Sequence, residues 1–165
     1  MACSIAILDY LNLLDIATFK EFSKSIFIRG RMEKVKDNII IDTGLVGMDM
    51  LLLGLEVSLG NNYKVVYSTV PYTDENEWVK ESRRHNGEYL KRAKYIYLTS
   101  PENNPREEEI FINDVMGENY LNYSFISDPK ECLKKAIQEL KRDETLIIVA
   151  RNDYRMYRHL VEELS

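Results

Sequence analysis

The chain has 165 residues, 45% of them hydrophobic and 30% charged, which supports one domain with a real core and leaves little room for a second. Its formal net charge of -5 argues against duplex nucleic acid as the main partner, because nucleic-acid-binding domains carry a basic face. Cys3 and Cys132 show neither metal-ligand spacing nor a disulfide framework, which favours structural, reduced thiols in the cytoplasm.

The first predicted elements are a strand and a long helix. Ser4–Leu8 is a short apolar run that predicts a strand, and Asp15 is suited to cap a helix over about residues 16–35. The amino end lacks the basic segment and long apolar core of a secretory signal, and the apolar run at 51–55 is flanked by Asp49 and Glu56. We therefore expect neither secretion by that route nor contact with a membrane.

A strand, a glycine turn, a buried helix and a second strand follow, and they organise the rest of the chain. Asn38–Asp42 predicts a strand covered on both faces, and the almost wholly apolar segment Met48–Leu59 predicts a buried helix. Gly60 stands where a helix-terminating residue is expected. Lys64–Val70 is the return strand, closed by Pro71, since proline cannot continue a central ladder.

The turn between the first strand and helix of this unit is a candidate anion site. Thr43, Gly44 and Gly47 lie where unpaired backbone N–H groups and the positive end of a helix dipole converge. The same two glycines are equally consistent with a tight turn alone. Asp49 would repel a phosphate, so we interpret it as an acceptor for a sugar hydroxyl or a base amine.

The remaining chain alternates helices and strands. The pattern predicts a helix over Glu75–Arg84 that carries Trp78, a strand over Tyr95–Thr99, a loop over Ser100–Pro105, a helix over Arg106–Gly117 and a strand over Tyr120–Ser127. The next helix is capped by Asp128, has Pro129 in its first position, and buries the face that carries Leu133, Ala136, Ile137 and Leu140. A strand over Thr145–Ala150 and a last helix from a cap at Asp153 to Leu164 complete the chain's predicted elements.

This alternation predicts an α/β fold, a single Rossmann-like three-layer domain with a mostly parallel sheet of five to six strands. Ligands of such sheets bind at the carboxyl ends of the strands, near a topological switch point. The segments expected there are residues 9–12, 43–47, 71–78, 100–104 and 127–128.

Several short motifs resemble the SLOG superfamily of Rossmann-like proteins, which includes the LOG enzymes and the DNA-processing protein A fold, with a divergent YpsA-like branch as the nearest match. They are Thr-Gly-x-x-Gly-x-Asp at 43–49, Pro71-Tyr72 followed by Trp78, the segment Glu88–Lys94, and Ile112–Glu118, which keeps an asparagine at Asn113 and a methionine at Met116. The resemblance extends from Asn38 over most of the chain.

The resemblance implies a ligand site rather than a catalytic one. LOG enzymes hold a nucleotide phosphate with a Pro-Gly-Gly-x-Gly-Thr loop, whereas this chain has Ser127-Asp128-Pro129 where relatives carry a glycine-rich turn. We expect a sensor or sponge for a nucleotide-derived small molecule, with no cofactor, metal or catalytic residue and with the homodimerisation common among relatives. The expected ligand-binding residues are Thr43, Gly44, Gly47, Asp49, Pro71, Tyr72, Trp78, Asn113 and Asp128.

Three other readings remain open from the sequence. Acids near strand ends, Asp9, Asp42 and Asp153, would suit a magnesium-dependent ribonuclease of the NYN or PIN type, although its usual third-strand acid pair is missing. A LOG-type hydrolase of N-glycosidic bonds would use Asp49 or Glu118 as its acid. The last reading is an interaction protein that has kept the fold and lost the pocket.

Overall fold

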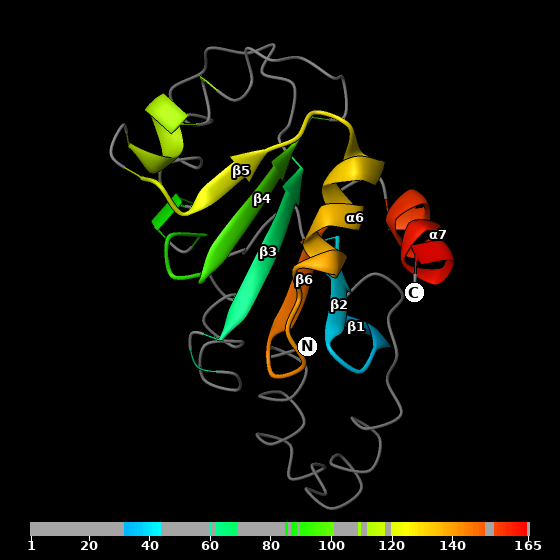
Figure 1. Cartoon of the computed structure of the whole chain (residues 1–165). Helices are drawn as coiled ribbons and strands as arrows, with labels where there is room; N and C mark the ends of the chain where they lie inside the picture. Colours follow the sequence, from blue (N-terminus) through cyan, green and yellow to red (C-terminus); the bar gives the residue numbers. More distant parts are fainter. Residues whose placement is uncertain are drawn as a thin grey trace, which may run out of the picture.

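The computed structural model describes residues 32–43, 60, 62–68, 85, 87–88, 90–100, 109, 112–117, 120–150 and 154–164. Over these residues the chain is an α/β protein built on a six-stranded sheet (Figure 1). The strands are β1 (Glu33–Lys36), β2 (Ile39–Asp42), β3 (Tyr63–Ser68), β4 (Tyr95–Thr99), β5 (Tyr123–Phe125) and β6 (Thr145–Val149); the helices are the π-helix η1 (Ile112–Met116) and the α-helices α6 (Pro129–Gln138) and α7 (Tyr154–Leu164).

The sheet is mixed and its strand order is β1-β2-β6-β3-β4-β5. The neighbours from β2 to β5 pair in parallel, whereas β1 runs antiparallel to β2. The predicted α/β class is confirmed, and five of the six strands in the described residues, β2 to β6, correspond to predicted strands. The antiparallel pair was not predicted.

Strand β1 corrects the prediction of a helix that continues to residue 35. Glu33 pairs with Ile41 and Lys34 with Ile40, and the two residues Asp37 and Asn38 form the turn into β2. The exposed edge of β2 supplies hydrogen-bond partners that a helix at this position would leave unused, so strand pairing overrides the local preference. The rest of that predicted helix and the strand at Ser4–Leu8 lie outside the described residues.

The other predicted strands agree with the structure apart from their ends. Strand β4 has the predicted bounds, β3 begins one residue before the predicted start, β5 is shorter than the predicted segment, and β6 ends one residue early. Within the predicted helix at 106–117, residues 112–116 form a π-helix that ends at Gly117, whose φ of 82° is left-handed. Gly60 is also left-handed, with φ 60°, and the helix predicted before it, at 48–59, lies outside the described residues.

Helix α6 begins as its sequence predicts. The Asp128 carboxylate accepts a hydrogen bond from the Glu131 backbone N–H at 2.9 Å, and Pro129 occupies the first turn. Its buried residues are Cys132, Leu133 and Ala136, while Ile137 and Leu140 are partly buried. Helix α7 ends at Leu164 as predicted, and its predicted cap lies outside the described residues.

Alternate residues of the central strands pack into two core clusters, one on each face of the sheet. Val66 and Ile148 join the cluster beneath α6 and α7, whereas Val65 and Ile147 join the cluster on the opposite face. Both faces of β3 and β6 are therefore covered, which explains why apolar residues occupy consecutive positions at 65–67 and 146–149. No helix in the described part of the chain has the length and apolarity needed to cross a membrane.

Candidate functional site

Polar side chains are buried where the parallel strands end. Asp42, Ser68, Thr99 and Ser100 stand at or just after the carboxyl ends of β2, β3 and β4, and their exposed fractions are 5%, 2%, 0% and 0%. The register pairs Ser68 with Thr99, and both Tyr67 and Asp42 with Val149, so these strand ends are adjacent. We call the group Asp42, Ser68, Thr99 and Ser100 the polar edge.

The polar edge lies at a topological switch point. The connection after β3 contributes Leu90 and Ala93 to one core cluster, while α7, which follows β6, contributes Tyr157 and Leu160 to the cluster on the opposite face. Because the chain leaves two neighbouring parallel strands toward opposite faces, a crevice is expected beyond their carboxyl ends. Ser68 is the last residue of β3, one of these two strands.

Hydrogen bonds tie the ends of β4 and β5 together. The Thr99 hydroxyl donates to the Ser127 carbonyl at 3.0 Å, and the Ser100 N–H donates to the same carbonyl at 3.3 Å. The Thr99 hydroxyl is thereby oriented by the protein. Sequence reasoning included Ser100 and Ser127 in the ligand edge.

Sequence reasoning missed Ser68 and Thr99 as site residues. Ser68 was placed inside a strand that was predicted to continue to Val70, and Thr99 was treated as the last residue of an apolar strand. The signal that could have identified them is a single hydroxyl residue that closes an apolar run, as in VVYS at 65–68 and YIYLT at 95–99. Such a residue is costly to bury unless it has a partner.

The end of β2 is held by two hydrogen bonds. The Ala150 N–H donates to the Asp42 carbonyl at 2.9 Å, and the Met32 N–H donates to the Asp42 Oδ2 at 3.0 Å. Thr43 follows, partly buried, at the rim of the sheet. Gly44, Gly47 and Asp49 lie outside the described residues, as do Pro71, Tyr72 and Trp78.

The other two predicted site residues are described, and the structure gives them different positions. Asp128 is exposed and its Oδ1 is used to cap α6. Asn113 is exposed on η1, which leads into β5, and β5 is separated from β2 by three strands. In the part of the chain that the structure describes, no hydrogen bond joins Asn113 to the end of β2.

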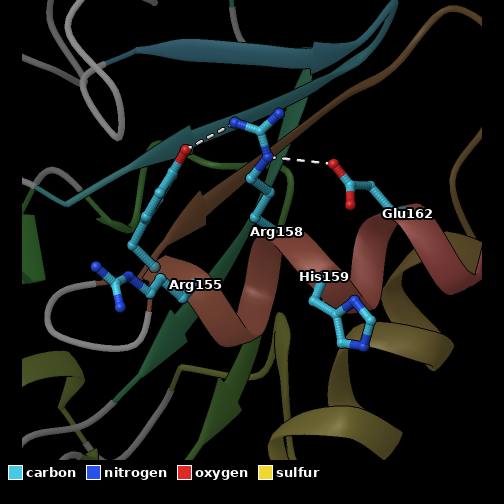
Figure 2. A pocket seen from close by; sticks show the side chains of 5 residues that line it. Arg155, Arg158, His159 and Glu162 are labelled. Atoms are coloured by element: carbon cyan, nitrogen blue, oxygen red, sulfur yellow. Dashed lines mark hydrogen bonds and ion pairs between the residues drawn. The ribbon is translucent and has the colours of Figure 1, made fainter.

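A surface hollow of about 460 Å³ lies along α7 (Figure 2). It is lined by Tyr154, Arg155, Arg158, His159 and Glu162. Most of its charges are paired within the protein: Arg158 contacts Glu162 and the buried Glu33, and His159 contacts Glu163. Two arginines and one glutamate line the hollow, and one of the two arginines, Arg158, is already held by Glu33 and Glu162.

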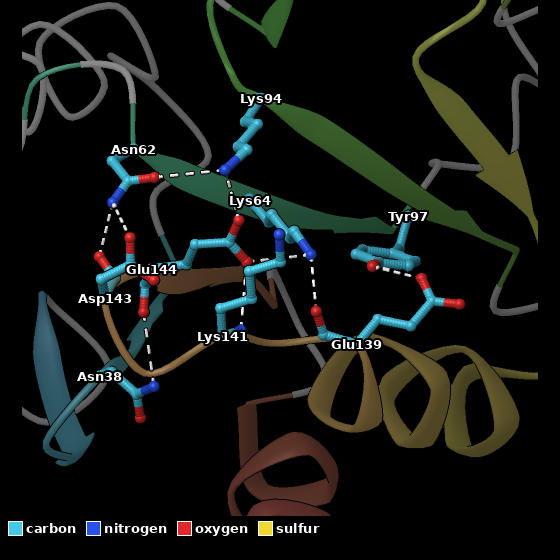
Figure 3. A network of polar contacts seen from close by, with 9 residues as sticks. All are labelled: Asn38, Asn62, Lys64, Lys94, Tyr97, Glu139, Lys141, Asp143 and Glu144. Carbon is cyan, nitrogen blue, oxygen red and sulfur yellow. Dashed lines mark hydrogen bonds and ion pairs between the residues drawn. The ribbon is translucent and has the colours of Figure 1, made fainter.

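An ion network lies at the amino ends of the strands, at the other end of the sheet from the polar edge (Figure 3). Lys64 and Lys94 point toward Glu144, with Nζ to carboxylate distances of 3.0 and 2.6 Å, and the Lys64 Nζ also donates to the Glu139 carbonyl at 2.7 Å. Burial alone would raise the pKa of Glu144, but hydrogen bonds from Lys94, the Lys141 N–H and Lys64 outweigh burial and lower it to about 2. This network joins the amino ends of β3, β4 and β6.

The remaining chemistry of the described residues is limited. They contain no group of three histidine, cysteine, aspartate or glutamate side chains that could hold a metal ion, and Asp9 and Asp153 of the nuclease reading lie outside them. Burial raises the pKa of the Cys132 thiol to about 12, so that this buried cysteine is not a nucleophile at neutral pH. Comparison of the sequence with models of protein families and with curated proteins finds no match.

Proposed function

We propose that the protein binds a nucleotide or nucleotide-derived small molecule at the polar edge and acts as a sensor or sponge without catalysis. The observation that carries the proposal is the position of four polar side chains, Asp42, Ser68, Thr99 and Ser100, at or just after the carboxyl ends of the parallel strands β2, β3 and β4, where ligands of such sheets bind. Hydroxyl and carboxylate groups are suited to the hydroxyls of a ribose and the amines of a base.

The sequence motifs support the same class of ligand. The segment after β2, with Gly44 and Gly47, would add backbone N–H donors beside Thr43, and Asp49 would add a second acceptor. The proposal includes a Rossmann-like arrangement and a divergent place in the SLOG superfamily, on the motifs at 43–49 and 71–78. The proposal also includes a homodimer, since proteins of the SLOG superfamily often form dimers.

A thermal-shift screen with nucleotides and ADP-ribose derivatives tests the proposal. A ligand at one hundred times its Kd stabilises the folded state by about 2.7 kcal/mol, which corresponds to a rise in Tm of roughly 5 to 10 °C for a chain of this length. No shift with any compound at millimolar concentration would contradict the proposal.

Variants of the polar edge then locate the site. We expect Ser68→Ala and Thr99→Val each to weaken binding about tenfold, because each removes one hydrogen-bonding group. Thr145→Val is the matched control, since it makes the same replacement at the amino end of β6. If Thr145→Val weakens binding as much as Thr99→Val, the ligand does not bind at the polar edge.

A further inference from the structure

A buried carboxylate joins the start of β1 to helix α7. Glu33 is 3% exposed, and its carboxylate accepts hydrogen bonds from the Tyr154 hydroxyl and, at 2.6 Å, from the Arg158 Nη1. The Arg158 Nη1 also contacts the Tyr154 hydroxyl at 3.0 Å, and its Nε donates to Glu162 at 3.1 Å (Figure 2). We call the contacts of Glu33 with Tyr154 and Arg158 the clamp.

The residue before Glu33 has an unusual backbone conformation. Met32 has φ 47°, in the left-handed region that residues with a side chain disfavour. Its N–H points to the Asp42 Oδ2, which accepts it at 3.0 Å. Disfavoured backbone conformations persist only where surrounding contacts fix them, and they concentrate at functional sites.

Pairing with β2 alone fixes Met32 weakly. Strand β1 has four residues, and its register with β2 shifts between Lys34 and Lys36. Glu33 pairs with Ile41, so Met32 stands beside Asp42, the last residue of β2 and a member of the polar edge. The clamp is the contact that ties this end of β1 to a helix.

We propose that Arg158 is a positioning residue for the polar edge, a role that rests on the proposed function. By holding Glu33, Arg158 and Tyr154 keep Met32 in its left-handed conformation, and the Met32 N–H in turn fixes the Asp42 carboxylate at the end of β2. Arg158 touches no ligand in this account. Arg158 sets the orientation of the Asp42 carboxylate, which is the acceptor that contacts the ligand.

Amide hydrogen exchange measured by NMR tests the clamp without any ligand. We expect Arg158→Met to accelerate exchange of the Met32 amide about tenfold, with the amides of Ile147 and Ile148 in the central strand unchanged. Tyr154→Phe should give a smaller acceleration because Arg158 still holds Glu33, and Arg158→Lys should restore part of the protection. Glu162→Gln is the matched control, because it removes only the exposed partner of Arg158 and should leave exchange at Met32 unchanged.

Binding of AMP and ADP-ribose to the same variants tests the positioning role. We expect Arg158→Met to lower the affinity for whichever probe binds the wild-type protein by about tenfold. The measurement is made at a temperature where the amides of the central strand keep their protection from exchange. Unchanged exchange at Met32 in Arg158→Met overturns the clamp, and faster exchange with unchanged affinity overturns positioning. If neither probe binds the wild-type protein, the proposed function fails, and faster exchange at Met32 still supports the clamp.

Discussion

At the scale of single residues, burial decides what the ionisable groups can do. Glu144 is 1% exposed and is surrounded by Lys64, Lys94 and the Lys141 N–H, so it remains charged in the folded protein. Lys64 and Lys94 are distant from Glu144 in the sequence, and only the folding of β3, β4 and β6 brings them together. The sequence therefore predicted no ion network at this edge.

Glu144 should make stability depend on acid. Its pKa of about 2 lies below the ordinary value of 4.5, so its contribution is complete above pH 4.5 and is lost as the pH falls toward 2. We expect Glu144→Gln to lower the free energy of unfolding at pH 7 by about 2 kcal/mol, because Lys64 loses its buried counterion while water screens the half-exposed Lys94. Urea unfolding from pH 7 to pH 2 measures both effects.

The difference in the free energy of unfolding between the wild-type protein and Glu144→Gln should shrink below pH 4.5. A constant difference down to pH 2 would show that Glu144 acts through packing rather than through its charge.

Cys132 should react slowly in the folded state. Raising a thiol pKa from 9.0 to about 12 leaves about a thousandfold fewer thiolates at pH 8, and only the thiolate reacts with iodoacetamide. Labelling followed by mass spectrometry of the Cys132 peptide measures the rate in buffer and in denaturing urea. Equal rates in the two solvents would contradict the burial of this thiol.

At the scale of elements, signals within a few residues predicted more than signals between distant segments. The start of α6 was predicted to the residue, because Asp128, Pro129 and Glu131 carry the capping pattern themselves. Strand β1 was not predicted, because its partner is the edge of β2 and nothing in residues 33–36 alone distinguishes a short strand from a helix end. The same dependence on distant contacts moved the predicted ends of β3 and β5.

The cap of α6 can be tested by a pair of substitutions. Asp128→Ala should lower the free energy of unfolding by about 1 kcal/mol, because the Glu131 N–H loses its acceptor. Asp128→Asn keeps an acceptor oxygen and should stay within a few tenths of a kcal/mol of the wild-type value. Thermal unfolding monitored by circular dichroism compares them, and an equal loss in both variants would assign the effect to charge.

At the scale of the whole molecule, the general arrangement was easier to predict than the individual side chains. The alternation of strands and helices was sufficient to expect polar groups at the carboxyl ends of a parallel sheet, and the buried Ser68, Thr99 and Ser100 are found there. The individual side chains were harder to predict, because the burial of a hydroxyl depends on which strand lies beside it. The glycine turn at 44–47 and the segment at 71–78 remain predictions.

The central claim is that the polar edge, and not the ion network at the other end of the strands, receives the ligand. The most direct measurement is an NMR titration of amide chemical shifts with AMP and ADP-ribose. We predict that the largest changes occur at Thr43, Ser68, Thr99, Ser100 and Ser127, with Asn62, Lys94 and Glu144 unchanged. Changes centred on Asn62, Lys94 and Glu144, or no saturable change with either compound, would contradict the claim.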